Sequence, residues 1–269
     1  MLTTYMTKFI YLRKFILCLL LLVSIQSAQA DTLANALKDG VLRIGVSIYE
    51  PWVMKNKDGE LYGYEIQVAE QLAKDLGVKA DFHVVEWEEL IRALNDDKID
   101  IIISGMAITP QRALMVNFSH PYGDSGVSLA ANVQQTKDIK SLKELNTPNV
   151  TLGVVADTVS DPVAHSIFDK ANIKKFVKND DAVKALLEGD IHALIEASPV
   201  PKFLALEHPD IIDAPLSKPL LSYKAGMAVN KGEQEFLNYL NAWITARDAE
   251  GWLPAKHMHW FDSLDWKSD

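Results

Sequence analysis

The stretch from Ser104 to Tyr122 reads SGMAITPQRALMVNFSHPY and joins the end of a strand to the start of a helix. Directly before it, residues 99–103 (IDIII) form an apolar run typical of a short buried strand. Thr109 and Pro110 then provide an N-cap followed by proline at the first helical position. This predicts Arg112 in the first turn of a helix, beside free backbone N–H groups and the positive end of the helix dipole. Such an arrangement favours an anion, and a planar guanidinium suits a carboxylate.

Strand-like and helix-like patterns alternate on both sides of this stretch. Before it, we expect strands over 41–46, 80–85 and 99–103 and helices over 64–76, closed by Gly77, and 87–94. After it, we expect strands over 150–155, 174–177, 193–195 and 223–229 and helices over 162–171, 181–187, 199–206, capped by Ser198, and 233–247. Residues 133–149 are polar and suit a connection with a short helix. Repeated strand–helix–strand units predict mostly parallel α/β sheets in two lobes, with helices on both faces.

The first thirty residues are predicted to lie outside the fold. A basic start precedes an apolar run over residues 15–23, which is too short to span a membrane comfortably. Ala28-Gln29-Ala30 has the small-x-small pattern of a secretory cleavage site. We therefore expect a signal peptide over residues 1–30, cleaved after Ala30, and a periplasmic mature protein; an uncleaved anchor is the alternative. The single cysteine, Cys18, lies inside this segment, so the secreted chain must be held together by its core without disulfides.

The composition excludes some classes of partner. The 269 residues carry a formal net charge of −9 and no basic run stands out. Nucleic-acid binding is therefore not expected. The acidity is explained by solubility and does not identify a cationic ligand.

Two motifs carry a resemblance to a known family. They are residues 104–112 (SGMAITPQR) and residues 118–122 (FSHPY). Together they resemble the signature of the amino-acid-type periplasmic solute-binding proteins (family 3), the receptors that feed ABC importers. The similarity extends from about Leu33 to Phe261. It implies the type II periplasmic-binding-protein fold: two lobes, each a mostly parallel sheet flanked by helices, joined by two hinge crossings near Leu129 and Tyr223.

The resemblance also implies a domain organisation and partners. Residues 31–128 would form the first part of lobe 1, residues 129–222 lobe 2, and residues 223–269 a C-terminal return to lobe 1. A monomeric receptor would bind a small carboxylate-bearing, amino-acid-like ligand and dock on an ABC permease in the inner membrane. No chemistry, metal or cofactor is implied.

A general rule selects the candidate binding residues without reference to any family. In open α/β sheets, ligands bind beyond the carboxyl ends of the strands. The polar and aromatic residues that follow the predicted strands are Ser47, Tyr49, Glu50, Trp52, Ser104, Gly105, Met106, Arg112, Asp157, Thr158, Ser160 and Glu196. They include donors for a carboxylate and an acceptor for an ammonium group, which is the set that an α-amino acid requires.

Four of these residues have distinct predicted roles. Arg112 would clamp the ligand carboxylate; the alternative is a surface arginine, which the helix dipole disfavours. Glu196 stands where the resembled family usually has an aspartate that holds the amino group; the alternative is a surface carboxylate at a strand end. Tyr49 and Trp52 lie in the loop where the family places an aromatic against the ligand side chain, although Trp52 suits the core equally.

The remaining predictions concern the edges of the site. Thr158 matches a Gly-Thr turn of the family, but Asp157 replaces the glycine, and its carboxylate would repel a ligand carboxylate. Ser104 and Met106 would contribute backbone groups, and Thr109 the helix start. The family's Gly-Phe-Asp-x-Asp-Leu stretch appears here as residues 63–68 (GYEIQV), without either aspartate.

Two motifs and two rival functions complete the sequence analysis. Residues 123–126 (GDSG) match a serine-protease motif that belongs in an all-β fold, and His257 and His259 are expected in an exposed tail without a third metal ligand.

Cyclohexadienyl dehydratases resemble the same receptors but use a glutamate acid at or near the position of Pro199, which cannot donate a proton. A ligand-sensing binding module, or a transglycosylase use of the fold, is expected to need domains beyond this one.

Overall fold

The computed structural model describes residues 31–262 and 264–267. The predicted signal peptide and Cys18 lie outside the described residues. Residues from Thr32 onward form one compact unit. Within the described ranges, no helix is both long enough and apolar enough to cross a membrane.

The elements alternate as expected over most of the chain. The first group is α2 (Thr32–Asp39), β1 (Val41–Val46), β2 (Met54–Lys55), β3 (Leu61–Tyr62), α3 (Tyr64–Leu76), β4 (Lys79–Val84), η1 (Trp87–Glu89), α4 (Leu90–Asn95), β5 (Ile101–Ile102) and α5 (Pro110–Ala113). After β6 (Asn117–Asn132) come α6 (Leu142–Leu145), β7 (Thr151–Val155), α7 (Ser160–Ile167), β8 (Asn172–Phe176), α8 (Asn179–Glu188), β9 (Ala193–Ala197), α9 (Val200–Glu207) and β10 (Ile212–Asp213). The chain continues through β11 (Leu221–Val229), α10 (Gln234–Ala249), α11 (Trp252–Phe261) and η2 (Asp265–Lys267).

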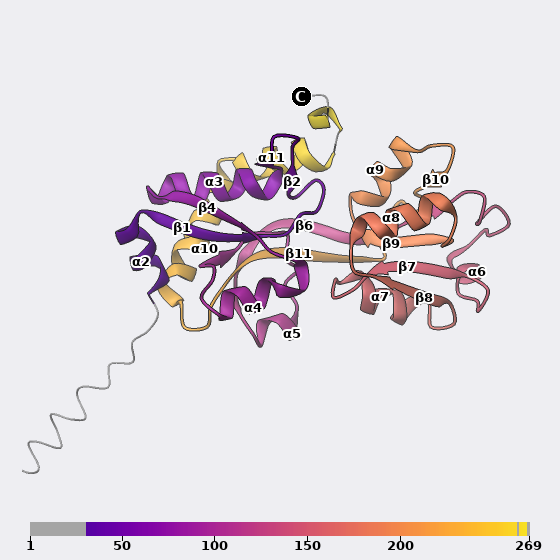
Figure 1. The fold of residues 1–269 in the computed structure, drawn as a ribbon, viewed down its shortest axis with the longest axis horizontal. Coiled ribbons are helices and arrows are strands. Elements are labelled where there is room, and N and C mark those ends of the chain that lie inside the picture. The colour runs from indigo at the N-terminus through magenta and orange to yellow at the C-terminus, as the bar shows by residue number, and fades with distance from the viewer. Residues whose placement is uncertain (1–30, 263, 268–269) are drawn as a thin grey trace, which may run out of the picture. The chain divides into compact units, whose positions relative to one another are not determined.

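One sheet runs through both halves of this unit, in the order β4-β1-β5-β11-β6-β9-β7-β8 (Figure 1). At one end β1 pairs in parallel with β4 and β5, and at the other β7 pairs in parallel with β8 and β9. Between them, the long strands β6 and β11 are antiparallel to each other and to their neighbours. We call β4, β1 and β5 with their helices the first lobe, and β9, β7 and β8 with theirs the second lobe.

Helices cover both faces of each parallel end. Figure 1 shows α3 and α4 on opposite sides of β1, and α8 and α7 on opposite sides of β7. The α3 helix illustrates why the sequence folds in this way: Val68 and Leu72 are fully buried on one stripe. Gly77 then ends the helix at φ 73°, a left-handed conformation that glycine adopts readily, and donates to the carbonyls of Ala73 and Lys74. The predicted helix and its glycine cap are confirmed.

Separate apolar clusters fill the space under these helices. In the second lobe, Leu152, Val154 and Ile195 pack against Phe168. On the α4 face of the first lobe, Leu94 and Ile102 belong to a cluster of their own. A sheet with a core on both sides explains the continuously apolar strands that the sequence shows.

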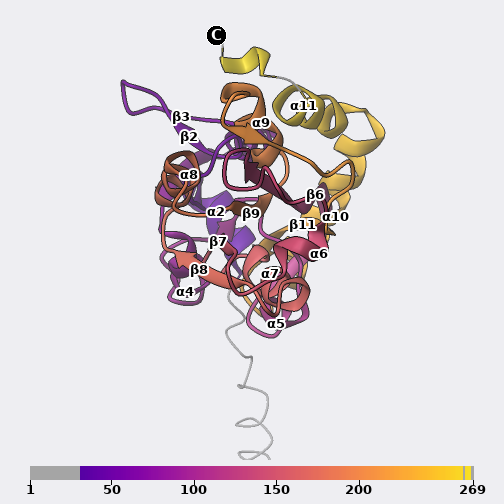
Figure 2. The ribbon, with the colours of Figure 1, turned by 90° about the vertical axis from the view of Figure 1, so that its right-hand side faces the viewer.

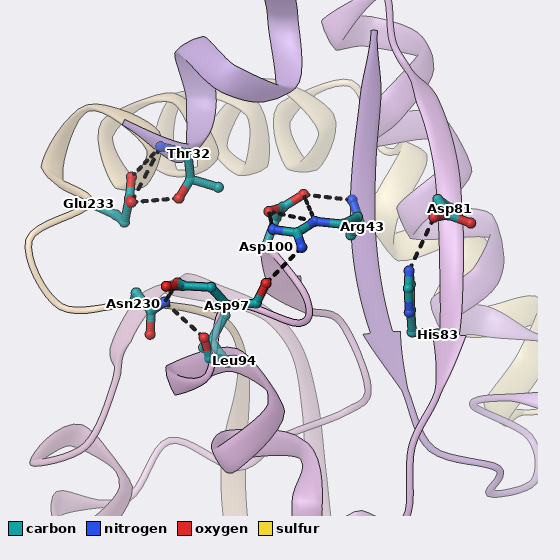
Figure 3. A network of polar contacts seen from close by, with 9 residues as sticks. All are labelled: Thr32, Arg43, Asp81, His83, Leu94, Asp97, Asp100, Asn230 and Glu233. Carbon is teal, nitrogen blue, oxygen red and sulfur yellow. Dashed lines mark hydrogen bonds and ion pairs between the residues drawn. The ribbon is translucent and has the colours of Figure 1, made fainter. Parts of the chain in front are cut away.

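A group of polar contacts lies near the N-terminal end of β1 in the first lobe (Figure 3). Arg43 Nη2 lies 2.5 Å from Asp100 Oδ1, and the backbone N–H of Arg43 donates to Asp100 Oδ2 at 2.8 Å. Glu233 accepts from the backbone N–H and the hydroxyl of Thr32, at 3.1 and 2.5 Å. These contacts tie β1 to the residue before β5 and α2 to the residue before α10, which fixes the base of the first lobe.

Three details differ from the sequence analysis. The 16-residue strand β6 was not predicted, because its glycines and proline interrupt the strand pattern. Ser198 does not cap α9: Pro199 occupies that position, and no side chain caps the helix. The C-terminal segment with His257 and His259 is the helix α11 rather than a tail, and Trp260 Nε1 donates to Gln67 Oε1 of α3 at 3.0 Å.

Candidate functional site

A cavity of about 260 Å³ lies between the two lobes, at the carboxyl ends of β1, β5, β7 and β9. Six of the eight residues with a predicted binding role line it: Tyr49, Trp52, Ser104, Arg112, Thr158 and Glu196. The strand-end candidates Ser47, Gly105 and Ser160 line it as well. Met106 and Thr109 do not line it. Met106 is 2% exposed in the α4-side core, and the Thr109 hydroxyl is occupied by the N–H of Arg112, at 3.2 Å.

Arg112 is held in place by its own short helix and by backbone carbonyls. Thr109 caps α5 and Pro110 is its first residue, as predicted. The guanidinium donates from Nη1 to the Ala107 carbonyl at 3.2 Å and from Nη2 to the Asp157 carbonyl at 3.0 Å. Burial lowers the pKa of this guanidinium. Since both acceptors are neutral carbonyls, the positive charge of Arg112 remains available to an anion in the cavity.

Trp87 is the main cavity residue that the sequence analysis missed. Its ring centroid lies 5.3 Å from Cζ of Arg112, within the range of a cation–π contact, and its Nε1 donates to the Asp157 carbonyl at 3.1 Å. Trp87 follows β4, so the strand-end rule that selected the other residues would have found it too. It shields one side of the guanidinium and contacts both lobes.

Glu196 is a buried carboxylate with one free oxygen. It is 1% exposed at the end of β9, and Oε1 accepts from the N–H of Ala197 at 2.7 Å. Oε2 has no hydrogen-bond partner among the described residues. Burial raises the pKa of Glu196 to about 7, against the opposing effects of Tyr49 and of the Ala197 N–H. An ionised carboxylate in this position would be stabilised by a cation in the cavity.

Two stacked aromatic rings form the wall next to Glu196. The rings of Tyr49 and Trp52 are 4.9 Å apart and inclined by 24°. Trp52 also packs edge-on against Phe261 and is only 4% exposed, so it is both a core residue and a cavity wall. Burial raises the pKa of Tyr49 well above its ordinary value, so its hydroxyl stays protonated. This pair presents a flat apolar surface with one hydroxyl.

The turn after β7 differs from the expectation based on Asp157. This residue has φ 58°, and its carbonyl accepts from both Arg112 and Trp87. It thus acts in the site through its backbone, and the structure gives its carboxylate no place in the cavity wall. Thr158 Oγ1 donates to the Val155 carbonyl at 2.8 Å and accepts from the N–H of Ser160 at 3.2 Å. Ser160 is fully buried, lines the cavity, and its Oγ is unpartnered within the described residues.

Behind the cavity, a polar cluster supports the Ser104–Gly105 turn. Ser104 Oγ accepts from the N–H of Ser47 at 2.9 Å, which ties the ends of β5 and β1 together. The N–H of Gly105 donates to the Tyr122 hydroxyl at 3.2 Å, and this hydroxyl donates to Glu65 Oε2 at 2.7 Å. Burial raises the pKa of Glu65 to about 8. Tyr122 therefore has a structural role behind the cavity, and Glu65 is its partner.

The motifs that the sequence analysis set aside form no site. Ser125 of the GDSG motif lies in β6 and donates to the Ser198 carbonyl at 2.9 Å. His257 Nε2 lies 3.1 Å from the Asp124 carbonyl. In the part of the chain that the structure describes, no group of three His, Cys, Asp or Glu residues could hold a metal ion.

The fold and this cavity define a two-lobe α/β solute-binding protein of type II. The chain matches the profile of the bacterial extracellular solute-binding proteins, family 3, over residues 42–263, and it belongs to this family. The predicted family and fold class are confirmed.

The relatives of this chain include binding proteins and an enzyme. The chain is 25% identical to cyclohexadienyl dehydratase of Pseudomonas aeruginosa over 257 residues, which cover 95% of this chain and 96% of the relative. It is 26% identical to the L-cystine-binding protein of Escherichia coli over 241 residues, covering 89% and 90%. A solved binding component of an ABC transporter from Wolinella succinogenes, in complex with lysine, is 32% identical with a TM-score of 0.80, covering 86% of this chain and 99% of that one.

Proposed function

We propose that this protein is a periplasmic receptor that closes on a small amino-acid-like ligand and delivers it to an ABC permease. One observation supports this above all: among the described residues, the cavity between the two lobes holds a guanidinium whose hydrogen bonds go to neutral carbonyls and, opposite it, a buried carboxylate with one unpartnered oxygen. A buried charge without a partner is costly. An α-amino acid carries the two complementary charges in one molecule.

In this proposal, each side of the cavity binds one end of the ligand's charged group. Arg112 binds the carboxylate through its planar fork, with the hydroxyls of Ser104 and Ser160 within the same cavity wall. Glu196 binds the ammonium group through Oε2. The Tyr49–Trp52 stack covers the side chain, whose contact with flat aromatic surfaces is mainly apolar.

Binding is coupled to closure because the groups that bind the ligand come from different lobes. A ligand that bonds to both lobes stabilises the closed arrangement over the open one by its difference in affinity for the two. We assign residues 31–128 and 223–269 to the first lobe and residues 129–222 to the second, with hinges near Leu129 and Tyr223. The receptor would act as a monomer, secreted by cleavage after Ala30.

A ligand screen tests the proposal directly. The melting temperature is measured with each of the twenty L-amino acids, with polyamines and with dicarboxylates, and every compound that raises it is titrated by calorimetry. We expect at least one amino acid to bind, and Arg112→Ala to weaken that binding at least about a hundredfold. Failure of every amino acid, or unchanged binding by Arg112→Ala, would contradict the proposal.

A dehydratase is the second candidate, because one relative is a cyclohexadienyl dehydratase and because Glu196 is a buried acid with a pKa raised to about 7. Against it, Pro199 caps α9 and does not line the cavity, so the position predicted for the acid carries no proton donor there. Incubation with prephenate and arogenate, with detection of the aromatic product, separates the two. We expect no turnover; turnover that Glu196→Gln removes would favour the enzyme.

A further inference from the structure

A second cavity, larger than the first, adjoins the ligand site. It has a volume of about 650 Å³ and shares four lining residues with the first cavity: Ile48, Tyr49, Asn179 and Asp180. The two spaces therefore adjoin at these four residues. The first cavity alone is smaller than the roughly 300–1,000 Å³ usual for ligand pockets. We call the second cavity the outer groove.

The walls of the outer groove are largely apolar. Val53 and Met54 contribute from the first lobe, and α8 and α9 of the second lobe face them (Figure 1). Val183 and Leu187 are four residues apart on α8, so they lie on the same side of that helix and form a half-buried stripe. Phe203 of α9 completes this wall and is 4% exposed. Such a surface favours an uncharged, apolar group and makes burial of a charge costly.

The junction between the two cavities is polar. The side-chain Oδ1 of Asn179 is buried there without a hydrogen-bond partner among the described residues, and the buried Tyr49 hydroxyl faces the Glu196 carboxylate. Tyr49 lies beside Glu196, the predicted ammonium-binding residue, and influences its pKa. A ligand that extends from the head-group site into the groove therefore passes Tyr49 and Asn179. A polar link such as an amide would satisfy the Asn179 oxygen at the junction.

The edge of the outer groove is closed by the C-terminal segment. Lys267 lies 2.5 Å from Glu50 of the first lobe and also pairs with Glu207 at the end of α9, and both carboxylates line the groove. The Trp266 ring packs against Phe203, with centroids 6.1 Å apart, and Figure 1 and Figure 2 both show this segment on the same side of the molecule as α9. A volume of about 650 Å³ lies in the usual range for a small-molecule pocket.

We propose that the outer groove binds the distal part of the ligand, so that the preferred ligands are α-amino acids whose side chain continues through an amide into an uncharged apolar group. This inference depends on the proposed function, because the head group must first be held by Arg112 and Glu196. Its support is independent: the adjacency of the two cavities, the apolar stripe on α8 and the buried, unpartnered Asn179 Oδ1 at the junction.

Three matched probes test the groove by calorimetry: L-lysine, Nε-hexanoyl-L-lysine, and the same amide ending in a carboxylate, Nε-(5-carboxypentanoyl)-L-lysine. The hexanoyl compound should bind at least about tenfold more tightly than lysine, since it buries several methylene groups. The carboxylate-ended compound should lose this gain, because its charge would enter a largely apolar groove whose ionisable lining is four carboxylates (Glu50, Asp180, Glu188 and Glu207) against two lysines (Lys55 and Lys184).

A variant that fills the groove provides the second arm. Val183→Trp should remove the gain of the hexanoyl compound and leave lysine binding within about twofold, since Val183 lines only the outer groove. Leu206→Trp is the control: Leu206 lies on α9, is 58% exposed and lines neither cavity, so both affinities should be unchanged. Circular dichroism and the melting temperature establish that both variants fold.

Each outcome decides the inference. A hexanoyl compound no tighter than lysine, a gain that survives Val183→Trp, or no binding of any of the three probes would overturn it. The proposed function is tested separately by the screen of free amino acids. A protein that binds a free amino acid but gains no affinity from the extension would contradict the role of the outer groove and would still support the receptor function.

Discussion

The two lobes share a strand pattern but differ in how they prepare their side of the cavity. In each, a central strand pairs in parallel with two neighbours and is covered by helices on both faces. On the first-lobe side, Arg112 Nη1 donates to the Ala107 carbonyl and Ser104 Oγ accepts from the N–H of Ser47, while Arg112 Nη2 donates across to the Asp157 carbonyl of the second lobe. On the second-lobe side, Glu196 Oε2 and Ser160 Oγ are buried and unpartnered in the described part of the chain.

The difference assigns distinct tasks to the two lobes. A site whose donors are already held in position loses little conformational freedom when a ligand arrives. A buried carboxylate without a partner raises the free energy of the ligand-free state, and an ammonium group relieves this. We infer that the first lobe positions the ligand. The second lobe, through Glu196, contributes the larger part of the electrostatic free energy that favours the closed arrangement.

The largest expected effect is the loss of ligand affinity when Arg112 of the first lobe is replaced. Arg112→Ala should weaken binding of an amino acid found by the screen at least about a hundredfold, because it removes charge-assisted hydrogen bonds to the carboxylate. Calorimetry at pH 7.5 measures the change. Arg92→Ala is the matched control, since Arg92 is exposed and pairs with Glu89; its affinity should equal that of the unmodified protein.

Glu196→Gln should weaken the same ligand less, by about thirtyfold, because the amide oxygen still accepts a hydrogen bond but lacks the charge. The variant should also be more stable than the unmodified protein at pH 8. Native-state burial raises the pKa of Glu196 to about 7, so between pH 4.5 and 7 the native state binds more protons than the unfolded state and stability falls as pH rises.

Thermal unfolding at pH 5 and pH 8 measures this second effect. Glu70→Gln, a change at an exposed carboxylate on α3, should alter neither affinity nor its pH dependence. Equal stability of Glu196→Gln and the unmodified protein at pH 8 would show that the second lobe holds no destabilised carboxylate.

The pH dependence of binding should follow from the same group. With the pKa of Glu196 at about 7 in the free protein, the ammonium group must compete with a proton at lower pH. Affinity should therefore fall roughly eightfold between pH 7.5 and pH 6.0. Glu196→Gln should flatten this profile of affinity against pH. Glu65, a second buried carboxyl whose pKa is raised to about 8, is present in both proteins, so any effect of its titration is the same in the two profiles. A profile that is equally steep in both would assign the titration elsewhere.

The smallest effect is expected where the lobes are tied together outside the cavity. Lys267→Ala removes exposed ion pairs to Glu50 and Glu207 and should lower the free energy of unfolding by less than about 1 kcal/mol. Denaturant unfolding measures it, with Lys98→Ala, whose partner is Asp96 in the same lobe, as the comparison. A loss of several kcal/mol would show that this contact fixes the closed arrangement.

The sequence predicted what depends on local periodicity and on strand ends. The strand over 41–46 and the helix over 64–76 have the predicted bounds, and the Thr109–Pro110 helix start is as expected. Six predicted residues line one cavity, because the carboxyl ends of parallel strands converge whatever the identity of the side chains.

The remaining features depend on contacts between distant segments. β6 follows no simple pattern, because its glycines and proline are tolerated by the pairing with β11. No local signal indicates that the Asp157 carbonyl, rather than its carboxylate, meets Arg112, since this depends on a positive φ in a turn 45 residues away. The hydrogen bond between Glu65 and Tyr122 likewise joins residues 57 positions apart.

The central claim is that Arg112 and Glu196 hold the two opposite charges of one ligand, and a pair of ligands tests it most directly. Calorimetry compares the best-binding amino acid with its carboxamide, which lacks the carboxylate, in the unmodified protein and in Arg112→Ala. The account predicts that the carboxamide binds the unmodified protein at least about a hundredfold more weakly than the amino acid, and that Arg112→Ala binds both compounds equally. A carboxamide that still binds Arg112→Ala much more weakly than the amino acid does would contradict it.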